Sequence, residues 1–348
     1  MLRLERLRLR ASRALHDRLG LKRTVYVTER VEEYRRYWEE AAAILGASFN
    51  PLTREVWEVR SGARSIRLSN HITPCDDHAT RVLAGDKPYC YGLARALGVP
   101  VADHVVFDVA DLAAAHRFFE AHDPPFVLKP ARDTASGMGI STGLLTWPMV
   151  VRGIALASLY GRNLLLERMV AGESCRLLYL DGVLIHAVRR RGVRVLGDGA
   201  RNLGALLEAS GLGALTRDDN TRFTLAAAGR VLTDVPAQGE DVLVRGLPAT
   251  IVERRELRTV YDEDVTALCA PALASELAAV VRALGSEFAG IDIITNDLGR
   301  PLRESGGTFL EINTTPGIHH HYITPRTAEP VAKLVLAHLL EGHRNGRS

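Results

Sequence analysis

Hydrophobic residues recur at helical spacing in eight segments of the chain. One face of the first segment, 31–45, carries Tyr34, Trp38 and Ala42, and Gly46 follows its last turn. The other predicted helices are 88–97, 111–121, 148–159, 202–210, 219–228, 271–286 and 328–341. Helices are therefore expected along most of the chain.

Short apolar runs between the helical segments predict β-strands. The predicted strands are 56–60, 65–68, 104–107, 126–129, 163–167, 290–295 and 308–313. A hairpin is expected over 175–189, because Asp181-Gly182 is a turn signal between two apolar runs. Residues 130–143 are expected to form a loop rich in Gly, Ser and Thr, and 192–265 to be irregular apart from two short helices. Strands and helices mix without a repeated strand–helix–strand order, so the expected fold class is α+β.

The composition is that of a globular protein and excludes several kinds of partner. The chain has 348 residues, 47% of them hydrophobic and 24% charged, which suggests about two domains and excludes a disordered or fibrous chain. No apolar run approaches the roughly 18–20 residues that span a bilayer, so no membrane partner is expected. The net charge of +3 argues against a nucleic-acid partner. The sequence does not fix the oligomeric state, and a homodimer stays open.

The cysteines and the N-terminus bear on location. Four cysteines lie far apart and form no C-x-x-C pair; they are Cys75, Cys90, Cys175 and Cys269. Reduced thiols and a cytoplasmic protein are therefore expected. Residues 1–19 are amphipathic and rich in arginine, as in a transit peptide. Glu5 and Asp17 interrupt that pattern, and a surface helix is the favoured interpretation.

Lysine is rare in this chain. Of 44 basic residues 40 are arginine, and the four lysines are Lys22, Lys87, Lys129 and Lys333. A lysine is a compact point charge and an arginine a planar fork, so they are not interchangeable where geometry matters. Lys129 ends an apolar strand just before the glycine-rich loop, which suits a polyphosphate, because the ammonium and the loop N–H groups can both contact phosphate oxygens. A lysine beside an ordinary loop is the alternative.

Glu167 ends the strand 163–167 and precedes an apolar pair and a tight turn. Such a segment can form a hinge for a purine, in which backbone groups pair with the adenine edge and a carboxylate takes a ribose hydroxyl. An acid exposed to solvent at a strand end is the alternative interpretation.

Three polar residues lie inside apolar strands: Asp292, Glu311 and Asn313. Glu311 and Asn313 are two positions apart and so project from one face of their strand. A buried carboxylate must be paired or bind a metal. Oxygen ligands suit Mg²⁺, which proteins hold with a few carboxylates and substrate phosphates. Pairing with arginine is the alternative in so arginine-rich a chain.

The order of these segments resembles the ATP-grasp superfamily. That order is Lys129-Pro130, the glycine-rich loop, Glu167-x-x-x-x-Gly172, Gly290-x-Asp292 and Glu311-x-Asn313-x-x-Pro316-Gly317. The resemblance covers about 86–325, and within the superfamily it is nearest to the ligase domain of the cyanophycin synthetase family. The segments that carry this nearer likeness are 197–199, 234–240 and 300–317. The flanking domains of that family are not recognised, so a stand-alone ligase is expected.

The resemblance implies an ATP-grasp fold, in which two α+β subdomains grip ATP behind a small N-terminal α/β domain. The implied boundaries are 1–85, 86–165 and 166–348. The implied cofactors are ATP and Mg²⁺, and the implied activity is that of an ATP-dependent ligase. Such an enzyme joins a small-molecule carboxylate to an amino-acid or peptide amine through an acyl phosphate and releases ADP and phosphate.

The resemblance also assigns a role to each group of residues. The residues implied to hold the nucleotide phosphates are Lys87 and Lys129. Those implied to form a lid over them are Ser136, Gly137, Met138, Gly139 and Ile140. Those implied to form the adenine hinge are Glu167, Arg168, Met169 and Val170. The implied Mg²⁺ ligands are Asp292, Glu311 and Asn313, and the implied catalytic residues near the transferred group are Arg190 and Arg176.

One position departs from the family pattern. The acid that binds the ribose in the family falls at Ser174 here. Glu173 lies one position earlier and is the acid expected in its place.

Two alternatives to the peptide ligase remain open. One is an ATP-grasp enzyme that makes a non-peptide amide, and the other is a nucleotide-binding protein without ligase activity. The full set of Lys129, Asp292, Glu311 and Asn313 disfavours the second, since a degenerate binder would be expected to lose metal ligands.

Two runs of polar residues bear on the substrate. An arginine-rich run, 189–201, suits an anionic substrate, and a solvated basic face is its alternative. The run His319-His320-His321 follows Pro316-Gly317 and is expected to form a polar pocket wall or a surface loop. A metal site is disfavoured there because consecutive side chains rarely converge on one ion.

Overall fold

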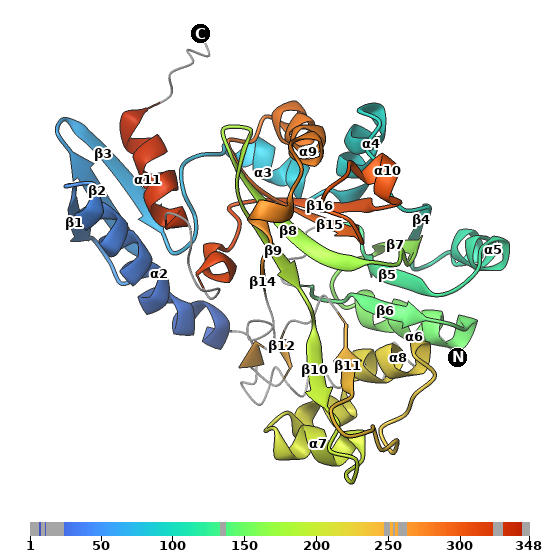
Figure 1. Ribbon diagram of the computed structural model, residues 1–348. Coiled ribbons are helices and arrows are strands. Elements are labelled where there is room, and N and C mark those ends of the chain that lie inside the picture. Colours follow the sequence, from blue (N-terminus) through green and yellow to red (C-terminus); the bar gives the residue numbers. More distant parts are fainter. Residues whose placement is uncertain are drawn as a thin grey trace.

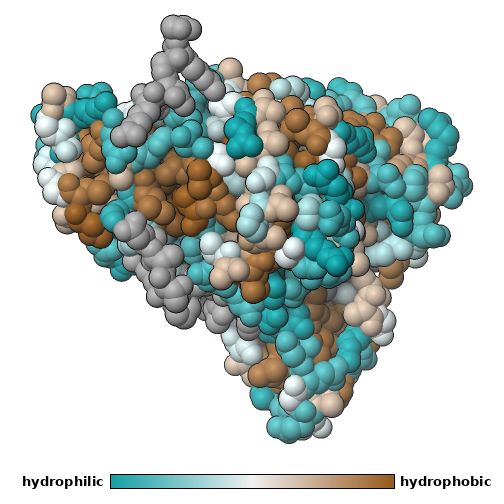
Figure 2. Space-filling model, turned by 45° about the horizontal axis from the view of Figure 1, so that its top comes forward, coloured by the Kyte–Doolittle hydropathy of each residue, from teal (hydrophilic) through white to brown (hydrophobic). Residues whose placement is uncertain are grey.

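The structure is a computed structural model, which describes residues 24–132, 137–246, 251, 252, 255, 256, 263–322 and 330–342, together with 7 and 11. Ser136 and nearly all of the predicted N-terminal surface helix lie outside the described residues. Among the described residues, no helix is both long and apolar enough to cross a membrane. The face shown in Figure 2 is mostly hydrophilic and carries smaller hydrophobic patches.

The N-terminal region forms a helix beside a small antiparallel sheet with strand order β1-β2-β3. Its elements are α2 (Thr24–Ile44), β1 (Ser48–Pro51), β2 (Val56–Ser61) and β3 (Arg64–Ser69). The last helix, α11 (Val331–Glu341), packs along α2 and β3 (Figure 1). Trp38 and Trp57 are fully buried in the core that these elements share. The end of the chain therefore closes the N-terminal core.

A four-stranded antiparallel sheet with order β4-β7-β5-β6 follows. Its strands are β4 (His104–Asp108), β5 (Phe126–Pro130), β6 (Ser141–Leu144) and β7 (Asn163–Arg168). The helices that pack with it are α5 (Ala113–Ala121) and α6 (Trp147–Ala157). Apolar residues of both helices and of the strands, such as Ile154 and Phe126, form its core.

A five-stranded antiparallel sheet with order β14-β9-β8-β15-β16 forms the centre of the molecule (Figure 1). Its strands are β8 (Glu173–Leu180), β9 (Val183–Arg190), β14 (Glu263–Asp264), β15 (Phe288–Thr295) and β16 (Thr308–Thr314). The helices near it are α3 (His78–Ala84), α4 (Lys87–Ala96), α9 (Pro271–Leu284) and α10 (Leu302–Ser305), with the 3₁₀ turns η3 (Thr266–Leu268) and η4 (Ile318–His321). One face of the sheet packs its apolar side chains against α4 and α9.

Residues 193–245 form a lobe with a small core of its own. Its elements are β10 (Val193–Leu196), α7 (Leu203–Ala209), η1 (Gly213–Arg217), α8 (Asp219–Ala227) and β11 (Asp241–Arg245). Helix α8 packs on β6 and so attaches the lobe to the four-stranded sheet. Two short strands, β12 (Ile251–Val252) and β13 (Arg255–Glu256), pair farther along the chain.

The α+β fold class is confirmed, since antiparallel sheets mix with packed helices. The prediction that 192–265 is irregular was wrong, because β10 pairs with β11 across 193–245. The prediction of a loop over 130–143 was wrong at its end, where β6 begins at Ser141 and pairs with β5. All three strands are short, and β6 (Ser141–Leu144) is rich in polar residues and glycine, so pairing with a partner strand rather than local pattern forms it. The division at residues 85 and 165 stays a prediction.

Leu178 provides a test of this packing. It is fully buried where β8 meets the N-terminal core, whereas Val183 at the start of β9 is 63% exposed. We expect Leu178→Ala to lower the free energy of unfolding by about 2–5 kcal/mol, because it leaves a cavity in a packed core. Val183→Ala is the matched control and should cost less than about 0.5 kcal/mol. Urea unfolding measures both, and equal losses would contradict the packing described.

Candidate functional site

One face of the five-stranded sheet carries most of the polar residues singled out in the sequence. The strand register places Asp292 opposite Arg176 on one neighbouring strand and opposite Glu311 on the other. Side chains directly opposite each other in a sheet project from the same face. Asn313 and Arg190 lie in the adjacent rows of that face. Residues far apart in the chain therefore meet on one surface, which we call the polar face.

Asp292 is the centre of a buried ion cluster on the polar face. Arg176 donates from Nε to Oδ1 over 2.7 Å and from its second terminal nitrogen to Oδ2 over 2.6 Å. Arg190 lies 3.1 Å from Oδ2 and also donates to Ser174 Oγ over 3.1 Å. Burial alone would raise the pKa of Asp292, but the two guanidinium groups outweigh it and hold the pKa well below its usual range. The arginine pairing left open for this carboxylate is therefore present.

Glu311 and Asn313 are more open than Asp292. Both are half-buried, and the Asn313 amide donates to Glu311 Oε1 over 3.2 Å. The same oxygen lies 3.8 Å from Arg176. Partly exposed carboxylate and amide oxygens fit Mg²⁺, which keeps several water and phosphate ligands. Within the described part of the chain, no group of three or more His, Cys, Asp or Glu residues is placed to hold a metal.

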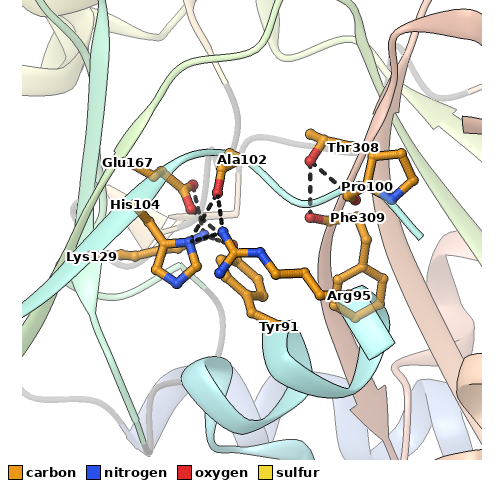
Figure 3. A network of polar contacts seen from close by, with 9 residues as sticks. All are labelled: Tyr91, Arg95, Pro100, Ala102, His104, Lys129, Glu167, Thr308 and Phe309. Atoms are coloured by element: carbon orange, nitrogen blue, oxygen red, sulfur yellow. Dashed lines mark hydrogen bonds and ion pairs between the residues drawn. The ribbon is translucent and has the colours of Figure 1, made fainter. Parts of the chain in front are cut away.

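The four-stranded sheet contributes a second buried ion cluster (Figure 3). Lys129 Nζ lies 2.8 Å from Glu167 Oε1 and donates to the Tyr91 hydroxyl over 2.8 Å. That hydroxyl donates to Glu167 Oε2 over 2.8 Å, which closes a triangle of three buried groups. The sequence analysis missed Tyr91. Tyr91 could have been found from its position four residues after Lys87, which places both residues on the same face of a helix.

Lys87 connects the two clusters. It is the first residue of α4, it is 5% exposed, and its backbone N–H donates to Ala131 O over 3.1 Å. Burial lowers the pKa of Lys87, while the carboxylate of Glu311 opposes that effect and Lys129 adds to it. Lys87 thus shares its electrostatic surroundings with Lys129 of one sheet and Glu311 of the other.

The described part of the glycine-rich loop, 137–140, is a tight turn. Gly137 and Gly139 have φ of 67° and 74°, values that side-chain-bearing residues rarely adopt. A Cβ on Gly139 would lie 2.7 Å from the ring of Tyr160. The carbonyl of Ile140 accepts a hydrogen bond from Asn220 of α8 over 2.9 Å. The end of the loop is thereby anchored to the lobe 193–245.

The predicted hinge begins with the last two residues of β7, an inner strand of the four-stranded sheet. The N–H groups of Arg168 and Met169 donate to Asp103 O and Pro125 O, each over 2.9 Å. The Glu167 side chain points into the ion cluster and is not exposed to solvent. Its alternative as a solvated acid is therefore excluded, while the adenine-hinge role stays a prediction.

Glu173 lies apart from the polar face. Glu173 lies three positions before Arg176 in β8, so its side chain projects from the opposite face of the sheet. Its carboxylate pairs with Arg189 over 2.9 Å. Arg189 in turn lies 3.3 Å from Glu263. No contact on the polar face supports a ribose-binding role for Glu173, which stays a prediction.

The other arginines of 189–201 are balanced by acids. Arg191 lies within 4 Å of two carboxylates, at 3.8 Å from Glu173 and 3.7 Å from Glu263. Arg194 pairs with Asp241 over 2.7 Å, and Arg201 pairs with Asp198 over 2.5 Å. These contacts favour the interpretation of the run 189–201 as a solvated basic face over its interpretation as a site for an anionic substrate. Arg190 differs, because it points into the buried cluster of the polar face.

The histidine run is buried, so the prediction of a surface loop is excluded. His319, His320 and His321 are each no more than 3% exposed on η4. The Nδ1 of His321 lies 2.8 Å from the Nδ1 of His186 on β9. Sequence analysis missed His186, because its pairing depends on a contact across 135 residues.

Comparisons with known proteins agree with the motifs. Cyanophycin synthetase from Trichormus variabilis is 26% identical over 91% of this chain, and the one from a Nostoc species is 27% identical over the same share. The chain spans 37% of the length of these relatives. No protein-family model matches the chain.

The fold is also found in a solved structure. The bifunctional glutathione synthetase from Pasteurella multocida superposes with a TM-score of 0.52 and 16% identity, over 86% of this chain and 42% of that one. Such low identity is informative about the fold alone. The chain has the ATP-grasp fold that its motifs predicted, and it is related in sequence to cyanophycin synthetase.

Proposed function

We propose that this protein is an ATP-dependent carboxylate–amine ligase. The γ-phosphate of ATP passes to a substrate carboxylate, forming an acyl phosphate and ADP. A substrate amine attacks the acyl carbon, the carbon–oxygen bond to phosphate breaks, and an amide and free phosphate remain. The observation that carries the proposal is that each of two sheets holds a buried ion cluster, one centred on Lys129 and the other on Asp292. The sequence relationship to a synthetase over 91% of the chain supports it.

The nucleotide is proposed to lie between the two sheets. Lys129 and Lys87 would bind its phosphates, and the loop 137–140 with Ser136 would close over them. The main chain of 168–170 would pair with adenine. Glu167 then has an indirect role, since it holds the Lys129 ammonium in place through a 2.8 Å contact.

Arg176 and Arg190 are proposed to stabilise the oxyanions that form at the transferred phosphoryl and acyl groups. Asp292 fixes Arg176 through two hydrogen bonds and Arg190 through an ion pair, so both guanidinium groups need little reorganisation during reaction. Glu311 and Asn313 are proposed Mg²⁺ ligands, because their side-chain oxygens can accept further contacts. Asp292 is proposed as the third ligand. When bound, Mg²⁺ would neutralise charge on the phosphate oxygens of ATP.

The cellular location and the substrates remain proposals as well. Cys75, Cys90, Cys175 and Cys269 are all free thiols, which supports a cytoplasmic protein. The substrates are proposed to be a small-molecule carboxylate and an amino-acid or peptide amine.

The direct test is ATP turnover across a panel of small-molecule carboxylates and amino-acid or peptide amines, supplied singly and in pairs with Mg²⁺. The proposal predicts ADP and phosphate release that requires a carboxylate and an amine together, with an amide in equal amount. Release of AMP would contradict the acyl-phosphate mechanism. Tight Mg-ATP binding without turnover on any pair would instead favour a nucleotide-binding protein.

Glu311 tests the proposed metal site. Glu311→Ala should reduce ADP formation by about 100-fold or more, because it removes a ligand and leaves the fold intact. Glu304→Ala is the matched control, since Glu304 is exposed just before the same strand. The measurement is ADP release against Mg²⁺ concentration, with circular dichroism as the check on folding. Wild-type activity in Glu311→Ala would remove this residue from the metal site.

Lys129 tests the requirement for a point charge. Lys129→Arg keeps the charge, but a planar fork does not fit the triangle with Tyr91 and Glu167. We expect ATP turnover to fall by about 10-fold or more, since a misplaced cation loses more than 1 kcal/mol of transition-state stabilisation. Lys333→Arg on α11 is the control and should behave as wild type. Unchanged ATP turnover in Lys129→Arg would contradict the proposed phosphate contact.

A further inference from the structure

Two histidines and an aspartate form a chain of contacts beside the polar face. Asp264 Oδ2 lies 3.5 Å from His186 Nε2. His186 Nδ1 lies 2.8 Å from His321 Nδ1, and the two rings are nearly perpendicular. The other oxygen of Asp264 accepts hydrogen bonds from the backbone and the hydroxyl of Thr266, over 2.9 Å and 2.7 Å. The carboxylate at the end of the chain is therefore held in place.

The contacts determine which nitrogen carries each proton. The carboxylate of Asp264 favours a hydrogen on the nitrogen of His186 that faces it, Nε2. The other nitrogen of His186, Nδ1, is then an acceptor. The 2.8 Å contact requires one hydrogen between the two Nδ1 atoms, so His321 supplies it. The Nε2 atom of His321 is left with a free lone pair.

That Nε2 atom is buried and has no hydrogen-bond partner among the described residues. A buried polar atom without a partner is costly, and in a native fold it calls for a reason. The charged and titratable groups whose electrostatic effect reaches His321 are His186 and Arg190 from β9, Arg176 from β8 and His319 from its own turn. Asp264 from β14 acts on it through His186. His321 thus shares its surroundings with the two arginines proposed to bind the acyl phosphate.

The register agrees with this location. His186 and Arg190 are four residues apart on β9 and project from the polar face, as do Arg176 and Asp264. Burial lowers the pKa of His321 well below its usual value, and the neighbouring arginines act in the same direction. The ring is consequently neutral at physiological pH, and its Nε2 lone pair is unused among the described residues.

We propose that His321, oriented by His186 and Asp264, accepts the proton that the substrate amine releases during amide formation. This inference rests on the proposed ligase function. The amine nitrogen forms a bond to the acyl carbon and becomes positively charged. Its N–H proton passes to His321 Nε2, and the electron pair of the breaking carbon–oxygen bond leaves with phosphate. His321 is then the catalytic base, while His186 and Asp264 are positioning residues that orient its ring.

The test separates the two halves of the reaction. Hydroxylamine is largely uncharged at neutral pH and captures acyl phosphates without help from a base, so hydroxamate reports the first half. Amide reports both halves. The wild-type protein is first assayed with ATP, Mg²⁺ and the panel of small-molecule carboxylates and amino-acid or peptide amines, with and without hydroxylamine. Absence of both ADP and hydroxamate in wild type would overturn the ligase function itself, and the inference with it.

His321→Asn removes Nε2 while its amide can still donate toward His186. We expect amide formation to fall by about 100-fold or more, the usual contribution of a positioned base, with hydroxamate formation within about twofold of wild type. His116→Asn is the control, because His116 is an exposed histidine on α5. Normal amide formation in His321→Asn would overturn the proposal, as would equal losses of amide and hydroxamate.

Asp264→Asn is the second variant, and it decides the matter if His321→Asn does not fold. Asp264 favours the protonated form of His186, so the change Asp264→Asn should lower the pKa of the hydrogen-bonded pair His186 and His321. Amide formation falls at low pH, where His321 is already protonated. The pH at which the rate falls should be lower in Asp264→Asn than in wild type. The rate should also drop by about 10-fold. A fall in the rate at the same pH as in wild type would overturn the role proposed for Asp264 and His186.

Discussion

The structure depends on one constraint, which is that charges buried between its sheets must be paired. Asp292 is 3% exposed and would be costly as an isolated carboxylate. Arg176 and Arg190 remove that cost, and each binds Asp292 from a different strand. Removing one partner from such a buried pair typically costs about 3–5 kcal/mol. The register of three strands is therefore tied to the chemistry of the site.

The same constraint organises the other sheet. Lys129, Glu167 and Tyr91 satisfy one another, so the ammonium is held at a fixed position before any nucleotide arrives. Two main-chain contacts also join neighbouring parts of the fold: Val101, which precedes β4, bridges Phe309 of β16, and Lys87 of α4 donates to Ala131, which follows β5. The cations and carboxylates of the two clusters are thus placed relative to one another by the packed fold. Such prior organisation is what makes electrostatic stabilisation of a transition state effective.

Local pattern was enough to predict the long elements and the motif residues. Helices such as α9 and strands such as β7 have clear apolar periodicity, and Lys129, Asp292 and Glu311 stand out as charges inside apolar runs. The partners of those charges could not be predicted, because they depend on strand register over long distances. Arg176 and Asp292 are 116 residues apart, and nothing near either residue specifies the other.

The shortest strands and the histidine relay escaped prediction for the same reason. The sequence of β6 alone predicts a loop, and the segment forms a strand because it pairs with β5. The run that contains His321 stands out in the sequence but His186 does not, and their contact becomes visible only once η4 is packed on β9. The elements with a strong local signal were predictable, whereas the groups defined by tertiary contact were not.

The most direct test of the central claim is to follow oxygen from the substrate carboxylate. The measurement uses a carboxylate substrate labelled with ¹⁸O in both oxygens, together with ATP, Mg²⁺ and the amine, and analyses the released phosphate by mass spectrometry. Activation through an acyl phosphate predicts one ¹⁸O atom in each phosphate, in amount equal to the amide formed. Unlabelled phosphate accompanying amide formation would contradict the account.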